Sequence, residues 1–284
     1  MNTPGVMTIN DILEKAERLP SPPGTIMNII RTLEDGDATA EQLAKQIEAD
    51  VGLLTSVLRL VNSSHYAISG GVTSIRQAIV MLGFEAIRNL VCINGISDYF
   101  HRNSFGAFNY ENFVRHSIGV GCVAKVFAKS VSLNPDTAFV AAMLHDVGQF
   151  ALAITAPNEY RVVIEHMKKN DCHVVEAELA VLGVDHTKIG GHMAKHWQLP
   201  EAICDAIVGH HQTSDSNTDY GSSMADLTHV AEVFAHALEL GSSDQVPLLS
   251  DNAMLRLRLS FQKVSKSFGK IEEEYADYAQ MMGV

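Results

Sequence analysis

Residues 142–152 of the sequence, AMLHDVGQFAL, place a histidine and an aspartate side by side inside an apolar stretch. Burying an unpaired polar or charged side chain is costly, so His145 and Asp146 require a metal ion, a neighbour that shares a proton, or a bound substrate. Imidazole and carboxylate groups are ligands that iron, manganese, zinc and nickel take in proteins. The 13 histidines among the 284 residues also favour a metal or proton-transfer site.

Similar side chains occur along the second half of the chain, each in or beside an apolar segment with helical spacing. They are His116, His145, Asp146, His186, His210, His211 and Glu232. Because their sequence neighbours are largely apolar, each side chain must find its partner on another helix. A single histidine of this kind is usually a hydrogen-bonded core residue. Two adjacent polar pairs with further histidines on separate helices favour a shared metal site, and a hydrogen-bonded core is the alternative.

His192 and His196 form a second histidine pair with a spacing that could bind metal. They are four residues apart and share one face of a helix. No glutamate lies between them in the arrangement of the zinc metalloproteases. We therefore interpret both as surface or packing residues.

The periodicity of the sequence predicts an all-α fold. Apolar residues recur at helical spacing in almost every segment, and alternation over five or more residues is nearly absent. Thr39 forms a capping box at the start of one helix, and Ser74 caps another that Gly83 ends. Asn134, followed by proline, begins the helix that runs into His145.

Turn-forming segments divide the chain into three predicted parts. A polar, glycine-containing segment at 101–109 indicates a boundary near residue 105. We expect an N-terminal helical part at 1–105, a larger helical part at 106–241 that carries the ligand-type residues, and a C-terminal helical extension at 242–284.

Composition narrows the class of protein. The 21 basic and 33 acidic residues give a net charge of −12, which argues against a protein that mainly grips nucleic-acid phosphates. No apolar run approaches 18 residues, and the first residues lack the features of a secretory signal. The cysteines contain no CxxC pair and are expected to be reduced thiols: Cys92, Cys122, Cys172 and Cys204. We expect a cytoplasmic protein that does not enter a membrane.

The order of the ligand-type residues resembles the HD superfamily of metal-dependent phosphohydrolases. LHDVGQ is similar to that superfamily's LHDIGK motif. DHTKIG and GHH resemble two later motifs of the branch that hydrolyses cyclic di-GMP. The resemblance implies a mono- or dinuclear centre of Fe, Mn, Ni or Zn. Its ligands would be His116, His145, Asp146, His186, His210, His211 and Glu232. Glu232 stands where the superfamily usually has aspartate, and Asp226 is an alternative for that position.

The N-terminal part resembles one branch, the HD-related output domains (HDOD) of bacterial signalling. LPSPPGTI, RLVNSSHY and TSIRQAIVMLG follow that family's motifs in order, and the resemblance runs from about residue 12 to 240. Matching positions include Asp50, Asn62, Ser63, Tyr66, Ser74, Ile75, Ala78 and Gly83, with GVDH at 183–186 and WQLP at 197–200. The resemblance implies an HD-like helical bundle with an additional N-terminal helical subdomain. It also implies loss of phosphohydrolase activity, which is general in this family.

Three departures from the catalytic branch support a binding role. Gln149 stands where that branch has a lysine that could steady a phosphate. Residues 212–223 do not resemble the branch's GYP loop, and Glu232 is one methylene longer than aspartate.

We therefore expect a signalling protein that binds a protein partner or a small nucleotide ligand, with its metal centre either retained or vestigial and without metal. The alternative is an active phosphohydrolase on nucleotides or cyclic dinucleotides. In that enzyme Asp146 would bridge two metals and orient the nucleophile. Direct nucleic-acid binding has little support from the net charge.

Overall fold

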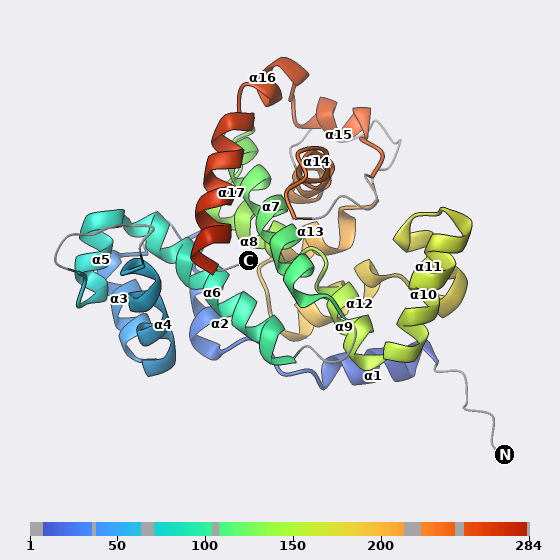
Figure 1. Ribbon diagram of the computed structural model, residues 1–284, viewed down its shortest axis with the longest axis horizontal. Coiled ribbons are helices and arrows are strands. Elements are labelled where there is room, and N and C mark those ends of the chain that lie inside the picture. The colour runs from blue at the N-terminus through green and yellow to red at the C-terminus, as the bar shows by residue number, and fades with distance from the viewer. Residues whose placement is uncertain are drawn as a thin grey trace.

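The computed structural model of the chain describes residues 8–35, 38–63, 71–103, 108–212, 223–241 and 247–282, and every regular element in these ranges is an α-helix (Figure 1). This confirms the all-α prediction. Tyr66 of the N-terminal motifs and most of the polar segment at 212–223 lie outside the described residues.

Among the described residues, six helices lie in the predicted N-terminal part. They are α1 (Ile9–Glu17), α2 (Gly24–Arg31), α3 (Ala40–Glu48), α4 (Val51–Val61), α5 (Ile75–Leu82) and α6 (Phe84–Asn103). Helices α3, α4 and α5 form the lobe on the left of Figure 1, and α6 runs from this lobe toward the centre of the molecule. Helix α1 lies apart from the lobe and packs on α9 and α12.

The predicted helix boundaries follow from capping. Thr39 and Gln42 make the full capping box of α3, and Ser74 accepts a hydrogen bond from the backbone of Gln77 at the start of α5. Gly83 ends α5 with φ of 92°, a conformation that glycine adopts without steric cost. Asn134 accepts hydrogen bonds from two backbone N–H groups at the start of α8.

The larger part surrounds a central group of helices. It contains α7 (Tyr110–Ala128), α8 (Pro135–Leu144), α9 (Val147–Thr155), α10 (Pro157–Asn170), α11 (Val174–Leu182), α12 (His186–His196), α13 (Glu201–Gly209) and α14 (Met224–Ala237). Helices α7, α8, α13 and α14 pack on one another, α12 packs on α9 and α13, and α10 and α11 form a pair at the right edge of Figure 1.

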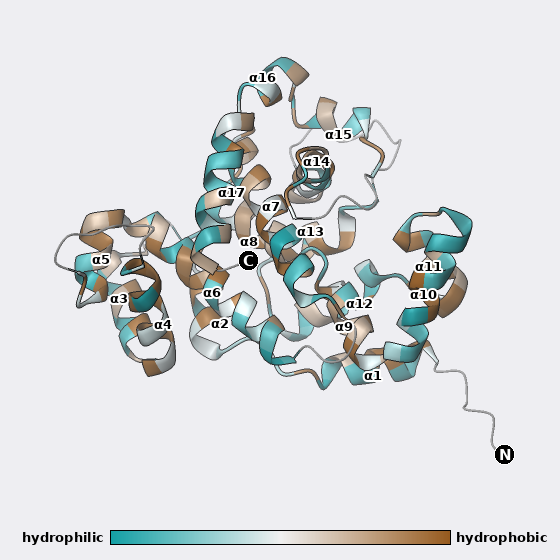
Figure 2. Ribbon diagram, viewed as in Figure 1, coloured by the Kyte–Doolittle hydropathy of each residue, from teal (hydrophilic) through white to brown (hydrophobic). Residues whose placement is uncertain are grey.

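Helices α8 and α9 are the apolar centre of the fold. The segment Pro135–Thr155 is apolar enough to cross a membrane by length and composition, but almost nine-tenths of its most apolar stretch is buried inside the protein. Brown residues accordingly gather toward the interior in Figure 2. The ring of Phe150 lies 4.6 Å from Phe100 of α6 and 5.9 Å from Phe113 of α7, which joins three helices beside the His-Asp dipeptide.

A buried ion pair ties the N-terminal part to this centre. Arg88 of α6 pairs with Asp136 of α8, and the side chain of Asn89 donates a second hydrogen bond of 2.8 Å to the same carboxylate. All three side chains are at least nine-tenths buried. A charge in such surroundings is stable only while its partner is present.

The C-terminal helices pack against α7 and α14. They are α15 (Asp251–Arg256), α16 (Phe261–Ser265) and α17 (Phe268–Met282). Helix α17 lies along α7, where Lys125 contacts Glu274 at 3.1 Å and donates a hydrogen bond to the hydroxyl of Tyr278. Arg256 of α15 forms a bidentate ion pair with Asp226 of α14, so Asp226 is already paired.

Candidate metal centre

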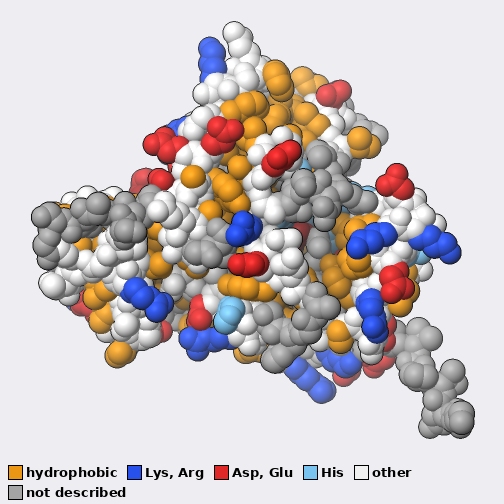
Figure 3. Space-filling model, in the orientation of Figure 1, with side chains coloured by type: hydrophobic (Ala, Val, Ile, Leu, Met, Phe, Trp, Pro, Cys, Tyr) orange, Lys and Arg blue, Asp and Glu red, His pale blue; other side chains and the backbone are white. Residues whose placement is uncertain are grey.

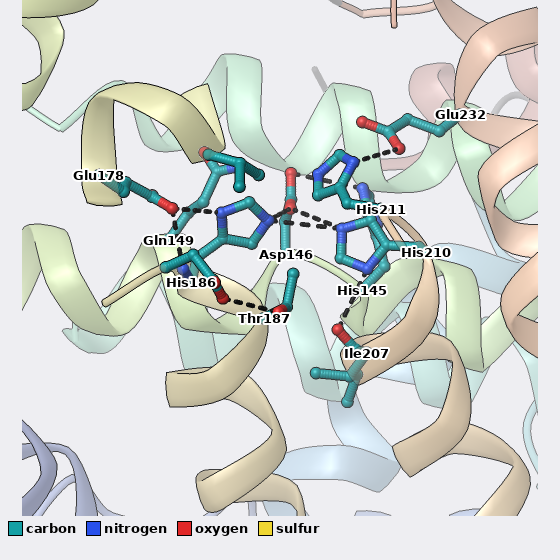
Figure 4. Close-up of polar contacts among 12 residues, drawn as sticks. His145, Asp146, Gln149, Glu178, His186, Thr187, Ile207, His210, His211 and Glu232 are labelled. Atoms are coloured by element: carbon teal, nitrogen blue, oxygen red, sulfur yellow. Dashed lines mark hydrogen bonds and ion pairs between the residues drawn. The ribbon is translucent and has the colours of Figure 1, made fainter. Parts of the chain in front are cut away.

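The His-Asp dipeptide lies at the break between α8 and α9. His145 is the C-cap of α8 and Asp146 the N-cap of α9, but the Asp146 side chain makes no capping hydrogen bond. His145 is fully buried and Asp146 is 5% exposed. The carboxylate is therefore free to point into a group of histidines (Figure 4).

The two oxygens of Asp146 face different histidines. Oδ1 lies 3.3 Å from Nε2 of His186 and 3.6 Å from Nε2 of His210. Oδ2 lies 3.3 Å from Nε2 of His145 and 4.0 Å from Nε2 of His116. A carboxylate with one oxygen toward each of two groups of imidazoles is suited to bridge two cations.

Hydrogen bonds on the far side of each ring fix its orientation. Nδ1 of His145 donates to the carbonyl of Ala142 at 2.6 Å, and Nδ1 of His210 donates to the carbonyls of Ala206 and Ile207 at 3.1 Å. A carbonyl only accepts, so Nδ1 carries the proton and Nε2 is left for a ligand in both rings. The carbonyl of His210 in turn accepts a hydrogen bond of 2.9 Å from Nδ1 of His229.

His186 has a carboxylate as its partner. Its Nδ1 and its backbone N–H both donate to Oε2 of Glu178, at 2.7 and 2.8 Å, and both residues are fully buried. Carboxylate–histidine–metal chains of this type are common around protein metals. The sequence analysis missed Glu178. Its position among apolar residues of α11 carries the same signal that singled out Asp146.

Close backbone contact brings α9 and α12 together. A Cβ atom on Gly148 would lie 1.9 Å from the carbonyl oxygen of His186, so only glycine fits there. A Cβ on Gly190 would likewise lie 3.2 Å from the backbone nitrogen of Gly148. These two glycines let the helix that follows Asp146 approach the helix that begins with His186.

Glu232 enters from α14, on the opposite side of the cluster from Glu178 (Figure 4). Its Oε2 lies 4.0 Å from Nδ1 of His211. Ligand atoms of Glu232, His145 and His210 lie within 4.8 Å of one another, as do those of Asp146, His186, His210 and His211. The structure therefore brings all seven sequence-predicted ligands into one cluster.

Several buried atoms of this cluster have no hydrogen-bond partner among the described residues. They are Nδ1 of His116, Nε2 of His145, Oδ1 of Asp146, Nε2 of His211 and Oε2 of Glu232. Such atoms are rare in native proteins because each costs free energy. Unpartnered imidazole nitrogens and carboxylate oxygens within one buried cluster fit a bound metal, which accepts both kinds of ligand.

Burial keeps most of the histidines in the form that binds metal. It lowers the pKa of His116 to about 3 and that of His210 to about 4, so both rings are neutral near pH 7. Burial raises the pKa of the Glu232 carboxyl to about 7. For Asp146 burial acts in the same direction, but His145 and His210 outweigh it and hold the pKa of that carboxyl well below its usual value.

The two remaining histidines of the sequence analysis lie away from the cluster. Nε2 of His192 contacts Oε1 of Glu17 on α1 at 2.6 Å, and His196 is exposed at the end of α12.

A cavity of about 220 Å³ opens onto the cluster. Besides the cluster members His116, Asp146 and Glu232, its lining includes the polar side chains of Asn112, Gln149, Tyr160, His173 and His236. The Tyr160 hydroxyl donates to Oε1 of Gln149 at 3.2 Å, which fixes a neutral amide at the position expected to carry a cation in a catalytic site. No lysine or arginine is present among the described residues that line the cavity.

The family model of the HDOD domain matches residues 19–213. A solved structure of an HDOD domain protein of unknown function from Geobacter sulfurreducens is similar over 96% of this chain and 99% of its own, with a TM-score of 0.78 and 26% sequence identity. The motifs noted in the sequence and the helical architecture therefore agree with two independent comparisons.

Curated relatives match at lower identity. An uncharacterised protein of Treponema pallidum is 23% identical over 74% of this chain and 40% of its own length. Ribonuclease Y of Mycoplasmoides gallisepticum is 27% identical over 69% of this chain and 32% of its own length. The chain thus spans about a third to two fifths of the length of these relatives.

Proposed function

This chain belongs to the HDOD domain family, and on that premise we propose that it is a bacterial signalling protein that acts by binding, with a metal centre at Asp146 as its ligand site. The observation that supports this proposal is the buried cluster of imidazoles and carboxylates around Asp146, in which several ligand-type atoms have no hydrogen-bond partner among the described residues. A vestigial site would be expected to have lost or satisfied some of these atoms.

The centre would be held by His116, His145, Asp146, His186, His210, His211 and Glu232. A divalent transition metal bound there acts as a Lewis acid toward a phosphoryl oxygen. Glu178 orients His186, and backbone carbonyls orient His145 and His210. The site's geometry is therefore set by the protein before a ligand arrives.

The cavity favours a small, phosphate-bearing ligand. Its volume of about 220 Å³ is below the roughly 300–1,000 Å³ of most small-molecule pockets. It fits a phosphate group or a terminal phosphate of a nucleotide. The amide N–H groups of Asn112 and Gln149 supply neutral donors for its oxygens.

Binding without turnover is favoured by the neutral lining. A cation aimed at the reacting phosphoryl group stabilises the charge that develops in the transition state. Gln149 cannot do this, and Tyr160 holds its amide in place. Acidic and basic side chains are also interspersed on the face shown in Figure 3, which does not present the single-sign surface of a nucleic-acid binder.

Elemental analysis of the purified chain, followed by calorimetric titration with inorganic phosphate and nucleotides, tests the proposal. We expect stoichiometric transition metal and ligand binding that chelation removes, with no consumption of the ligand. Asp146→Asn should lose both metal and ligand binding, whereas Asp205→Asn, a change on α13 outside the cluster, should retain both. A metal-free native protein would contradict the proposal.

A metal-dependent phosphohydrolase is the second candidate. The complete ligand set favours it, and the relative from Mycoplasmoides gallisepticum is named as a ribonuclease. Steady turnover of a nucleotide or cyclic dinucleotide by Mn-, Fe-, Ni- or Zn-loaded protein, abolished by His145→Ala with Asp146→Ala, would establish it. Absence of turnover in all four metal forms would exclude it.

A further inference from the structure

Two histidines outside the seven-residue set line the cavity, His173 and His236. His236 lies on α14 four residues after Glu232, and this spacing places both side chains on the same face of the helix. That face is directed toward His116 of α7. The rings of His116 and His236 have centroids 4.8 Å apart, and one ligand atom each of His116, Glu232 and His236 lie within 4.8 Å of one another.

We propose that His236 is a metal ligand that, together with His116 and Glu232, holds a second divalent cation on the cavity side of the centre. This inference rests on the proposed metal function and goes beyond it. No motif of the family resemblance includes His236, and the HDOD family match ends at residue 213, before α14 begins.

The carboxylates of the cluster supply a ligand for each of two cations. Oδ1 of Asp146 faces His186 and His210 on the inner side. Glu232 is 4% exposed, and its Oε2 has no hydrogen-bond partner among the described residues. A second cation next to Glu232 accounts for this buried oxygen, and the two carboxylates together offset part of the charge of two divalent ions.

A backbone contact close to the proposed ligands fixes the position of α14 along α7. Gly241 follows α14 with φ of 95°, and a Cβ atom there would lie 2.5 Å from the backbone of Arg115 and His116. The chain after His236 therefore packs directly on the backbone that carries His116. This contact holds the ends of the two helices together without any metal.

The three ligands leave room for an exogenous ligand. All three line the 220 Å³ cavity, and His236 is less buried than His116 and Glu232. A donor set of two histidines and one carboxylate with open positions is typical of Fe²⁺ and would also suit Mn²⁺. The outer cation would therefore exchange more readily than the inner one and would contact phosphate oxygens in the cavity.

The test is metal counting in full-length chains loaded with Mn²⁺. We expect the wild-type protein to retain two Mn²⁺ per chain after gel filtration and to show the electron paramagnetic resonance signal of a coupled pair. His236→Gln should retain one, with the signal of an isolated ion. His236→Glu, which restores a ligand atom, should recover the second ion, and His196→Gln, at an exposed histidine outside the cluster, should match the wild type.

Two results would overturn the inference. A wild-type chain with a single Mn²⁺, or a His236→Gln chain with an unchanged count and an unchanged coupled signal, excludes a ligand role for His236 and leaves the proposed metal function standing. A wild-type chain that binds no metal contradicts the proposed function as well. If His236→Gln fails to fold, His236→Asn takes its place, and an unchanged count with an unchanged coupled signal in that folded variant excludes the site.

Discussion

Oε2 of Glu178 accepts two hydrogen bonds from His186, one from Nδ1 at 2.7 Å and one from the backbone nitrogen at 2.8 Å. Burial alone would lower the pKa of His186, but the charge and the hydrogen bond of Glu178 outweigh it and raise that pKa to about 9. The ring is thus held with Nδ1 toward Glu178 and Nε2 toward Asp146. Glu178 positions a ligand without lying in the cavity.

Glu178→Gln should weaken metal binding by about 10- to 100-fold, the usual effect of losing a partner that orients a histidine ligand. Competition with a chromophoric chelator measures the affinity. Glu176→Gln, on the exposed face of the same helix, is the matched control and should leave the affinity unchanged. Equal affinities in both variants would show that Glu178 does not support the centre.

Gly148→Ala should destabilise the protein by about 1–3 kcal/mol, because the added methyl group meets the His186 carbonyl in a well-packed core. Urea unfolding of the metal-free protein measures this. Gly269→Ala, at a helical glycine with no atom within 4 Å of the new Cβ, should be neutral or stabilising by up to ~1 kcal/mol. A Gly148→Ala protein as stable as wild type would refute the close contact between α9 and α12.

The metal-free protein should lose stability as the pH falls below about 6.5. Burial lowers the pKa of His116 to about 3 and of His210 to about 4, so only the unfolded chain takes up protons on these rings just below pH 6.5. Burial raises the pKa of Glu232 to about 7, so between pH 7 and the pKa of glutamate in the unfolded chain the folded protein carries one extra proton on this side chain. That proton offsets one of the two that the unfolded chain takes up on His116 and His210. His145 and His186, whose pKa values neighbouring carboxylates raise against the effect of burial, are protonated in both states once the pH is well below 6.5. Between about pH 6 and 5 the net slope should therefore be at least about 1.4 kcal/mol per pH unit.

Thermal unfolding of the chelated protein from pH 6 to 5 checks this slope. His116→Gln should reduce it, because the variant removes one of the two histidines with a lowered pKa, while His196→Gln should leave it unchanged. A melting temperature that is constant over this range would contradict the burial of neutral histidines.

Arg88→Met should cost about 3–5 kcal/mol, because it leaves the buried carboxylate of Asp136 without its cation. Arg102→Met is the control on the same helix: its ion pair with Asp98 is exposed and should contribute less than about 1 kcal/mol. The double variant Arg88→Met with Asp136→Leu should recover much of the loss. A small effect of Arg88→Met alone in urea unfolding would refute the importance of this link between α6 and α8.

Gln149→Lys should increase the affinity of the metal-loaded protein for inorganic phosphate by about tenfold, since it adds a cation to a cavity whose described lining has none. Calorimetric titration measures the change. Gln262→Lys, at an exposed site on α16, controls for the added net charge. If both variants bind phosphate as the wild type does, the cavity is not the phosphate site.

Local signals predicted the helices well. The caps at Thr39, Ser74 and Asn134 depend on residues within three positions of each helix start, so the sequence contains all the information they need. The break between α8 and α9 at the His-Asp dipeptide was less evident, because Pro135–Thr155 is apolar throughout and its periodicity does not distinguish one long helix from two.

The candidate site was predicted through family resemblance more than through periodicity. Which helices face one another depends on tertiary packing, and no spacing along the chain shows that Glu178 lies behind His186 or that α14 packs on α7. Both residues missed by the sequence analysis had a usable signal. Glu178 is a carboxylate in an apolar run, and His236 follows Glu232 by one helical turn.

Helix α14 supplies Glu232 and His236, yet it lies beyond residue 213, where the family match ends. Relatives with equally good matches can therefore differ in whether they possess these two side chains. A match to the HDOD family alone does not distinguish proteins that contain a metal from proteins that do not. The residues at the positions of Glu232 and His236 are the ones to compare for that purpose, and a truncated chain that stops at the end of the match would lack both.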